Sequence, residues 1–151
     1  MLAYFLDMPS LFKPPVEVGS VSLVSLDILD NAVKQAIRLK YKDVKTVSLA
    51  SSVILHGTKY SEGMFVSVGS TSGLPDFAKI LKVLIVGNKA SFIVERFSAW
   101  YMDHFRCYEL TRKLSTDLEV ADPEELNNFS PLAPYMVQGR LMVSPKVFLL
   151  H

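Results

Sequence analysis

The fold class of this chain is decided by the stretch Tyr60–Gly69, with the sequence YSEGMFVSVG. Gly63 stands directly before a run rich in Val and Phe, which is the pattern of a tight turn entering a strand. A long aromatic-rich segment follows and continues to Glu109. The stretch therefore predicts the opening of a small, closed β-barrel.

Two short turn signals organise the strands around this stretch. Gly87-Asn88 is the sharper one, because positive φ costs Gly nothing and Asn little. Gln138-Gly139 is a second, weaker hairpin signal. Runs of Val, Ile, Phe and Tyr between turn residues predict strands at 46–55, 63–70, 77–86, 90–98 and 105–111. The residues flanking the first turn that we expect in the main core are Ile85, Phe92 and Val94.

One helix is predicted from Asp27 to Lys40. Apolar residues at the spacing of a single helix face are Ile28, Leu29, Ala32, Val33, Ala36 and Ile37. Ser25 or Asp27 is expected to cap its first turn, because a side-chain oxygen there accepts hydrogen bonds from free backbone N–H groups. The apolar face predicts that the helix packs against the sheet.

Length and composition are those of a single domain with its own core. The chain has 151 residues, of which 50% are hydrophobic, and a net charge of +1. A net charge this small excludes the strong overall electrostatic field that would by itself indicate binding to nucleic acid or to a membrane surface. The lone cysteine, Cys107, excludes an internal disulfide and indicates either a reducing compartment or indifference to redox state, so we expect an intracellular setting.

The charges are nevertheless unevenly distributed. Residues 34–45 are basic and contain one acid, Asp43, whereas residues 117–125 contain five acids and no base. Most charge runs are solvated faces, so the basic run is an alternative site and not the first choice. As a nucleic-acid-binding surface it would use Lys34, Arg38, Lys40, Lys42 and Lys45.

We divide the chain into an N-terminal segment, residues 1–20, and a single β-rich domain, residues 21–151. The segment begins with an apolar run that Asp7 and Pro9 interrupt, and it is shorter than the roughly 20 residues of a membrane span. We expect the segment to dock on the domain or on a preceding part of a longer protein, with Pro14 and Pro15 in a stiff link. No membrane association is predicted.

No residue pattern specifies a catalytic, metal or cofactor site. His104 and Cys107 offer too few ligands for a closed zinc site. Ser98, Asp103 and His104 do not form a catalytic triad, since adjacent residues of a strand point to opposite faces. We therefore predict no metal and no cofactor. We interpret three carboxylates as solvated strand residues, each beside a base: Glu95 with Arg96, Asp103 with His104, and Glu109 with Arg112.

The segment Phe97–Tyr108 holds the cluster best suited to bind a partner. Aromatic side chains on converging strands form cages and stacking platforms for cations, peptides or bases. Trp100 and Tyr101 point to opposite faces of a strand, so at least one ring is expected to be exposed. Core packing is the alternative interpretation. The predicted partner-binding residues are Trp100, Tyr101, Arg96 and Asp103.

Four stretches carry a resemblance to known proteins: Leu55–Val66, Gly73–Ile80, Asp103–Leu110 and Ser144–Leu149. They are similar to the C-terminal part of uncharacterised vertebrate proteins that are abundant in fish and look mobile-element-derived. Tyr60-x-x-Gly63 before a Val-rich strand also resembles the start of bromo-adjacent-homology and other Src-homology-3-like barrels. That resemblance implies binding of chromatin, peptides or nucleic acid, although a fold does not fix a function.

The sequence as a whole predicts a β-dominated α+β fold: a small, partly closed antiparallel β-barrel covered by one N-terminal amphipathic helix. The predicted function is a non-enzymatic interaction module that binds a protein partner or chromatin in an intracellular, nuclear setting. One alternative is a nucleic-acid-binding module that uses the basic end of the helix at 27–40. The other is a small enzyme domain without a recognisable motif.

Overall fold

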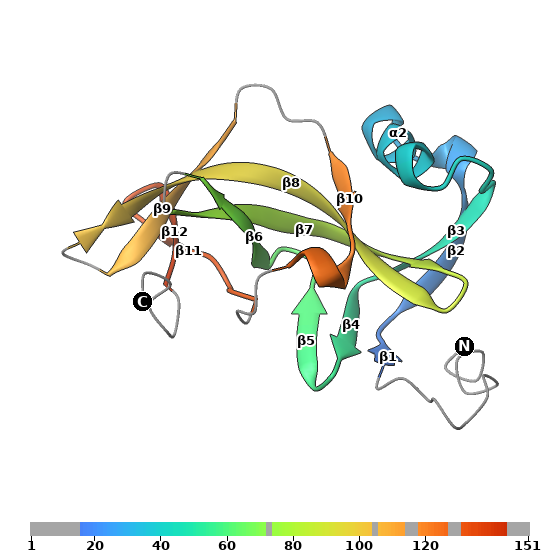
Figure 1. Ribbon diagram of the computed structural model, residues 1–151, viewed down its shortest axis with the longest axis horizontal. Helices are drawn as coiled ribbons and strands as arrows, with labels where there is room; N and C mark the ends of the chain where they lie inside the picture. The colour runs from blue at the N-terminus through green and yellow to red at the C-terminus, as the bar shows by residue number, and fades with distance from the viewer. Residues whose placement is uncertain (1–15, 72–73, 104–105, 114–117, 127–130, 145–151) are drawn as a thin grey trace.

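The computed structural model describes residues 16–71, 74–103, 106–113, 118–126 and 131–144, which form a strand-dominated α+β fold with one α-helix. The centre of the fold is a long antiparallel hairpin of β7 (Leu74–Val86) and β8 (Lys89–Met102), shown in Figure 1. Gly87 and Asn88 connect the two strands, and Gly87 has a φ of 63°. The hairpin predicted at this dipeptide is confirmed.

The neighbours of β7 and β8 change along the length of the long hairpin. The sheet therefore has two parts, which we call the helix arm and the barrel arm. The register shifts between Ile80 and Lys82, so Leu81 is an extra residue that bends β7. Near the turn, the helix arm has the strand order β2-β3-β7-β8-β10, with β2 (Val21–Ser25), β3 (Thr46–Ala50) and β10 (Glu119–Ala121). Beyond the bend, the barrel arm has the order β6-β7-β8-β9-β12-β11, with β6 (Phe65–Thr71), β9 (Cys107–Arg112), β12 (Arg140–Val143) and β11 (Tyr135–Val137).

The barrel arm curls until its two borders meet. Phe65 at the start of β6 exchanges two backbone hydrogen bonds of 2.8 Å with Leu132, which lies shortly before β11. Gln138 and Gly139, both with positive φ, join β11 to β12, so the second predicted hairpin is also confirmed. The side chains that fill this arm are Phe65, Phe77, Phe97, Tyr108, Leu110, Leu132 and Val143. The barrel arm is therefore the partly closed barrel expected from the sequence.

A second, bent pair of antiparallel strands connects the helix arm to a small three-stranded sheet. β2 continues from β1 (Val16–Val18), and β3 continues into β4 (Ser52–Leu55), with the same register in both pairs. The bend lies at Gly19, whose N–H donates to the carbonyl of Ser52 at 3.0 Å. β5 (Thr58–Ser61) completes the order β1-β4-β5. Residues 16–18 of the segment that we separated from the domain thus form a strand of it, and residues 1–15 lie outside the described residues.

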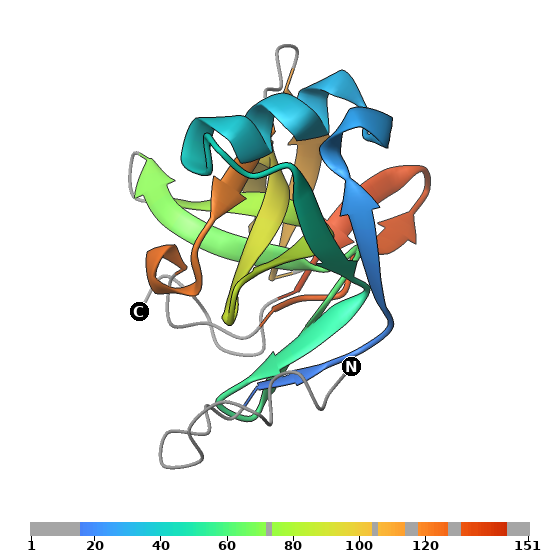
Figure 2. The ribbon, with the colours of Figure 1, turned by 90° about the vertical axis from the view of Figure 1, so that its right-hand side faces the viewer.

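The α-helix α2 (Asn31–Lys40) packs against β8 and β10 of the helix arm (Figure 2). A 3-10 helix, η2 (Leu26–Ile28), precedes it, and Ser25 Oγ accepts a hydrogen bond from the N–H of Asp27. The helix predicted from Asp27 is therefore two elements. Ile28 is exposed because it belongs to η2, whereas Ala36 and Ile37 are buried under α2. The residues that pack with Ile37 are Leu26, Val47, Leu84 and Ile93.

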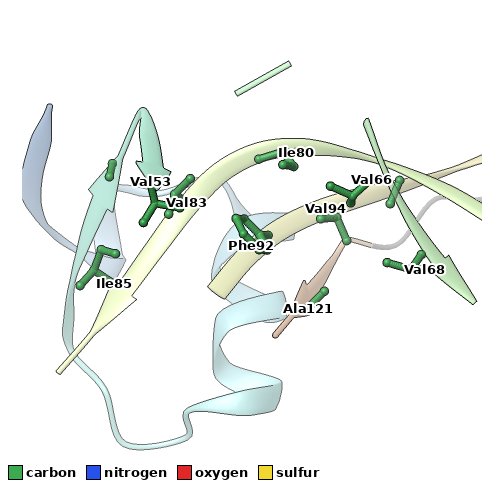
Figure 3. Close-up of a cluster of buried hydrophobic side chains, with 11 residues drawn as sticks. Val53, Val66, Val68, Ile80, Val83, Ile85, Phe92, Val94 and Ala121 are labelled. Carbon is green, nitrogen blue, oxygen red and sulfur yellow. The ribbon is translucent and has the colours of Figure 1, made fainter. Parts of the chain in front are cut away.

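The main core lies between the long hairpin and the three-stranded sheet (Figure 3). Ile85, Phe92 and Val94 are all buried there, which confirms their prediction as core residues. The Phe92 ring lies 5.1 Å from the ring of Tyr60 in β5, measured between centroids. β5 therefore closes this core.

Candidate functional site

Trp100 lies near the end of β8, and 66% of its surface is exposed. Its neighbour Tyr101 points into the barrel arm, where its ring centroid lies 5.1 Å from that of Tyr108. Because side chains alternate along a strand, Trp100 must point to the outer face of the arm. The expected alternation of the pair is observed, and Trp100 is the exposed ring.

The strand register places four side chains in one row on this outer face. Trp100 pairs with Glu109, Glu109 with Met142, and Met142 with Tyr135. Directly paired residues of an antiparallel sheet point to the same side. Trp100 and Tyr135 are exposed at the two ends, and Met142 is buried between them. This Trp100 row spans three strand spacings, or about 14 Å.

Polar groups lie within and beside the row. Glu109, between Trp100 and Met142, forms an ion pair of 3.7 Å with Arg140, which lies beside Met142 on β12. The Tyr135 hydroxyl is hydrogen-bonded to Ser144 Oγ. The row therefore combines two exposed aromatic rings with a charged pair between them.

The edge strand β11 adds further apolar surface to this end of the molecule. Tyr135, Met136 and Val137 are all exposed. Exposed apolar side chains that gather at one place mark interaction sites more often than scattered ones do. The sequence did not indicate β11 as part of the site, although Gln138-Gly139 predicted a hairpin beside it.

Two of the predicted partner-binding residues lie apart from Trp100. Arg96 points to the same face about 13 Å away along β8, and its guanidinium binds Glu119 at 2.9 and 3.3 Å. Asp103 follows β8 and is exposed, and its carbonyl accepts a hydrogen bond from the N–H of Arg106. Arg96 thus lies about as far from Trp100 as Tyr135 does, but its guanidinium is engaged by Glu119.

The remaining aromatic side chains pack as core inside the barrel arm. The ring centroids of Phe65 and Phe97 are 5.0 Å apart, and those of Phe77 and Tyr108 are 5.2 Å apart. Tyr108 is fully buried, and its hydroxyl has no hydrogen-bond partner in the described part of the chain. Burial, with a smaller effect from Tyr101, raises the pKa of this hydroxyl. Among the described rings of the Phe97–Tyr108 segment, Trp100 is thus exposed and the others pack inside the barrel arm.

The interpretation of Glu95 as a solvated carboxylate is wrong. Glu95 is buried and pairs with Arg112 of β9 at 3.3 Å, and the Arg112 guanidinium lies 5.8 Å from the centroid of Phe97. Glu109 likewise pairs with Arg140 and not with its sequence neighbour. Both partners come from adjacent strands, which the local sequence did not indicate.

The basic and acidic runs meet at the end of α2. Lys40 Nζ lies 2.6 Å from Asp122 Oδ2 and 3.6 Å from Glu125 Oε2. Ser91 Oγ donates to Asp122 Oδ1 at 2.9 Å, and Glu125 accepts from the N–H of Asp122 at 2.9 Å. The acidic residues therefore hold β10 and the short 3-10 helix η4 (Pro123–Glu125) against α2.

This ion pair shifts two pKa values. Burial opposes ionisation of Asp122, but hydrogen bonds from Lys40 and Ser91 together with the positive charge of Lys40 outweigh it and lower the pKa of the carboxyl. The hydrogen bond to Asp122 raises the pKa of Lys40. Lys40 is therefore engaged within the fold. Of the other predicted nucleic-acid-binding residues, Lys34 is half-buried, and the exposed ones are Arg38, Lys42 and Lys45.

A small pocket of about 260 Å³ lies between α2 and β10 and includes Leu39 and Val120. Small-molecule sites usually measure about 300–1,000 Å³, so this pocket is below their range. No cluster of three or more His, Cys, Asp or Glu side chains suited to a metal ion occurs among the described residues. In the same ranges, no helix has the length and apolarity needed to cross a membrane.

No protein-family model, no curated protein and no solved structure matches this chain. A function is therefore inferred from the residues of the chain itself. The observation with the most weight is the exposed indole of Trp100 on the outer face of the barrel arm.

Proposed function

We propose that the chain is a non-enzymatic interaction module that binds a protein partner through the Trp100 row. The observation that carries this proposal is the two-thirds exposure of Trp100, whereas Tyr108 and the phenylalanine rings inside the same arm are buried. Trp is enriched among the residues that dominate binding energy at interfaces. Covering the exposed part of an indole of roughly 250 Å² contributes about 4 kcal/mol at about 25 cal/mol/Å².

The partner is held by side chains, because β11 is a poor template for an added strand. In a two-residue hairpin the pair next to the turn, here Val137 and Arg140, is hydrogen-bonded, so the backbone groups of Met136 point outward. Two residues earlier Pro134 has no N–H, and Leu132 is already bonded to Phe65. Met136 alone therefore offers both an outward N–H and an outward C=O, and one residue cannot hold an added strand by backbone hydrogen bonds. A partner with an apolar surface that covers the exposed Trp100 indole fits this face.

The partner class is proposed from a resemblance. The likeness of Tyr60-x-x-Gly63 to the opening of chromatin-reading barrels supports a chromatin protein in a nuclear setting as the first class to test. Binding through the Trp100 row does not require a chromatin protein, since any protein surface that covers the exposed indole would fit it.

Nucleic-acid binding is the second candidate function. The exposed cations Arg38, Lys42 and Lys45 support it, because no acidic side chain pairs with them in the part of the chain that the structure describes. It takes second place because Lys40, in the same run, is neutralised by Asp122. Counterion release requires such binding to fall steeply with salt, so undetectable binding at low salt would remove this candidate.

Affinity capture from nuclear extract, followed by binding measurements with the purified partner, tests the proposal. Trp100→Ala should weaken binding by about 2 kcal/mol or more, roughly thirtyfold, with an unchanged melting temperature. Leu39→Ala is the matched control, because Leu39 is 81% exposed on α2, away from the Trp100 row. Equal affinities for the parent chain and Trp100→Ala would overturn the proposal.

A further inference from the structure

The strand β2 forms the outer border of the helix arm, at the opposite end of the sheet from β11 (Figure 1). Backbone hydrogen bonds at its two ends show which of its residues face β3. The N–H of Ser51 donates to the carbonyl of Ser20, and the N–H of Leu26 donates to the carbonyl of Lys45. Even-numbered residues therefore bond to β3.

The alternate backbone groups of β2 point away from the sheet. Hydrogen bonding alternates along an antiparallel strand, and the register between β2 and β3 is continuous. The N–H and C=O groups of Val21, Leu23 and Ser25 are therefore directed outward. No backbone hydrogen bond to these three residues from outside the β2–β3 pair occurs among the described residues. β2 thus offers a ladder of outward groups that β11 does not.

This border also lacks the usual protection of an edge strand. Natural sheets blunt their edges with proline, charged side chains or bulges. The sequence VSLVS of β2 contains no proline and no charge, and its pairing with β3 has no bulge. Leu23, at its centre, is 73% exposed. Such an edge is a template for another strand.

We infer that β2 pairs antiparallel with β2 of a second copy of the chain, about a two-fold axis through Leu23. In this register Leu23 faces its own equivalent, and Val21 faces the equivalent of Ser25. The outward residues 21, 23 and 25 are symmetric about Leu23, so each pair exchanges both of its backbone hydrogen bonds. The result is one sheet continuous across both copies.

Charge and symmetry favour a second copy over a foreign strand. A two-fold interface brings each residue near its own equivalent, so a charged edge would repel itself, and β2 has no charge. The same lack of charge leaves nothing to select a foreign sequence. Because a five-residue strand buries less than the roughly 1,200 Å² of a stable interface, we expect a dimer that dissociates on dilution. The Trp100 row stays open, since it lies at the other end of the sheet.

Sedimentation of the whole chain over a range of concentrations tests the inference. The parent chain should dimerise, whereas Leu23→Lys and Leu23→Glu should each remain monomeric at concentrations where the parent is mostly dimeric. Like charges would then face each other across the axis at about 5 Å. An equimolar mixture of the two variants should associate again, because opposite charges then pair. Ser22→Lys is the control, since it adds the same charge where it faces the equivalent of Val24.

Each contrary outcome overturns the inference. A parent chain that is monomeric at about 1 mM would exclude the dimer. Dimerisation of Leu23→Lys as strong as that of the parent would place the contact elsewhere. Two monomeric variants that fail to associate when mixed would exclude the axis through Leu23. A monomeric parent that loses a captured protein in Leu23→Lys would assign β2 to a foreign strand. Melting curves of each variant confirm that it is folded.

Discussion

Removal of one oxygen atom from the interior of the barrel arm, by Tyr108→Phe, tests how that arm is packed. Tyr108 is fully buried, and its hydroxyl has no partner within the described residues. A hydroxyl that loses water without gaining a partner costs about 1–3 kcal/mol. Phenylalanine keeps the ring contacts with Phe77 and Tyr101, at 5.2 and 5.1 Å between centroids. We therefore expect the free energy of unfolding to rise by about 1 kcal/mol.

Urea denaturation measures this change. With a slope of about 2 kcal/mol/M, a gain of about 1 kcal/mol moves the midpoint up by about 0.5 M. Tyr108→Ala is the matched control for the ring and should cost about 3–5 kcal/mol. A loss of more than about 1 kcal/mol for Tyr108→Phe would show that the hydroxyl is hydrogen-bonded in solution. The packing described for the barrel arm would then be incorrect.

Three further changes test other parts of the structure. Phe92→Ala should lower the free energy of unfolding by about 3–5 kcal/mol in denaturant melts, and a loss below about 1 kcal/mol would place the ring on the surface and exclude this register. Because the fold lowers the pKa of Asp122, its ionisation stabilises the protein above the ordinary carboxyl pKa, and this contribution is lost as the pH falls through the lowered value. The free energy of unfolding of the parent should therefore fall more in acid than that of Asp122→Asn. The difference should be about 1 kcal/mol or less, because the pair with Lys40 is partly solvated. Identical pH profiles of stability would contradict this. Replacing both Arg38 and Lys42 by Glu should change stability by no more than about 0.5 kcal/mol each, and unfolding in thermal melts would show that they are not surface residues.

Turn residues were the most informative local signal in the sequence. Gly87-Asn88 and Gln138-Gly139 tolerate positive φ, and both connect paired strands. A turn of known length sets the register of the strands beside it. The burial of Phe92 next to the first turn could therefore be predicted, as could the exposure of one ring in the adjacent pair Trp100 and Tyr101.

Contacts between remote segments could not be predicted in the same way. Lys40 and Asp122 are separated by 82 positions, and no local pattern connects them. Glu95 was assigned to the wrong base because the register of β8 with β9 places Arg112, and not Arg96, beside it. The common row of Trp100 and Tyr135 depends on three successive strand pairings, so alternation along one strand could not show it.

The emission of Trp100 tests the central claim most directly, because Trp100 is the single tryptophan of the chain. In the free protein its fluorescence should resemble that of indole in water and should be quenched strongly by acrylamide, since 66% of its surface is exposed. Saturation with the captured partner should shift the emission to shorter wavelengths and protect it from quenching. An emission spectrum and quenching that stay unchanged when the partner is fully bound would contradict the claim that the Trp100 row is the binding face.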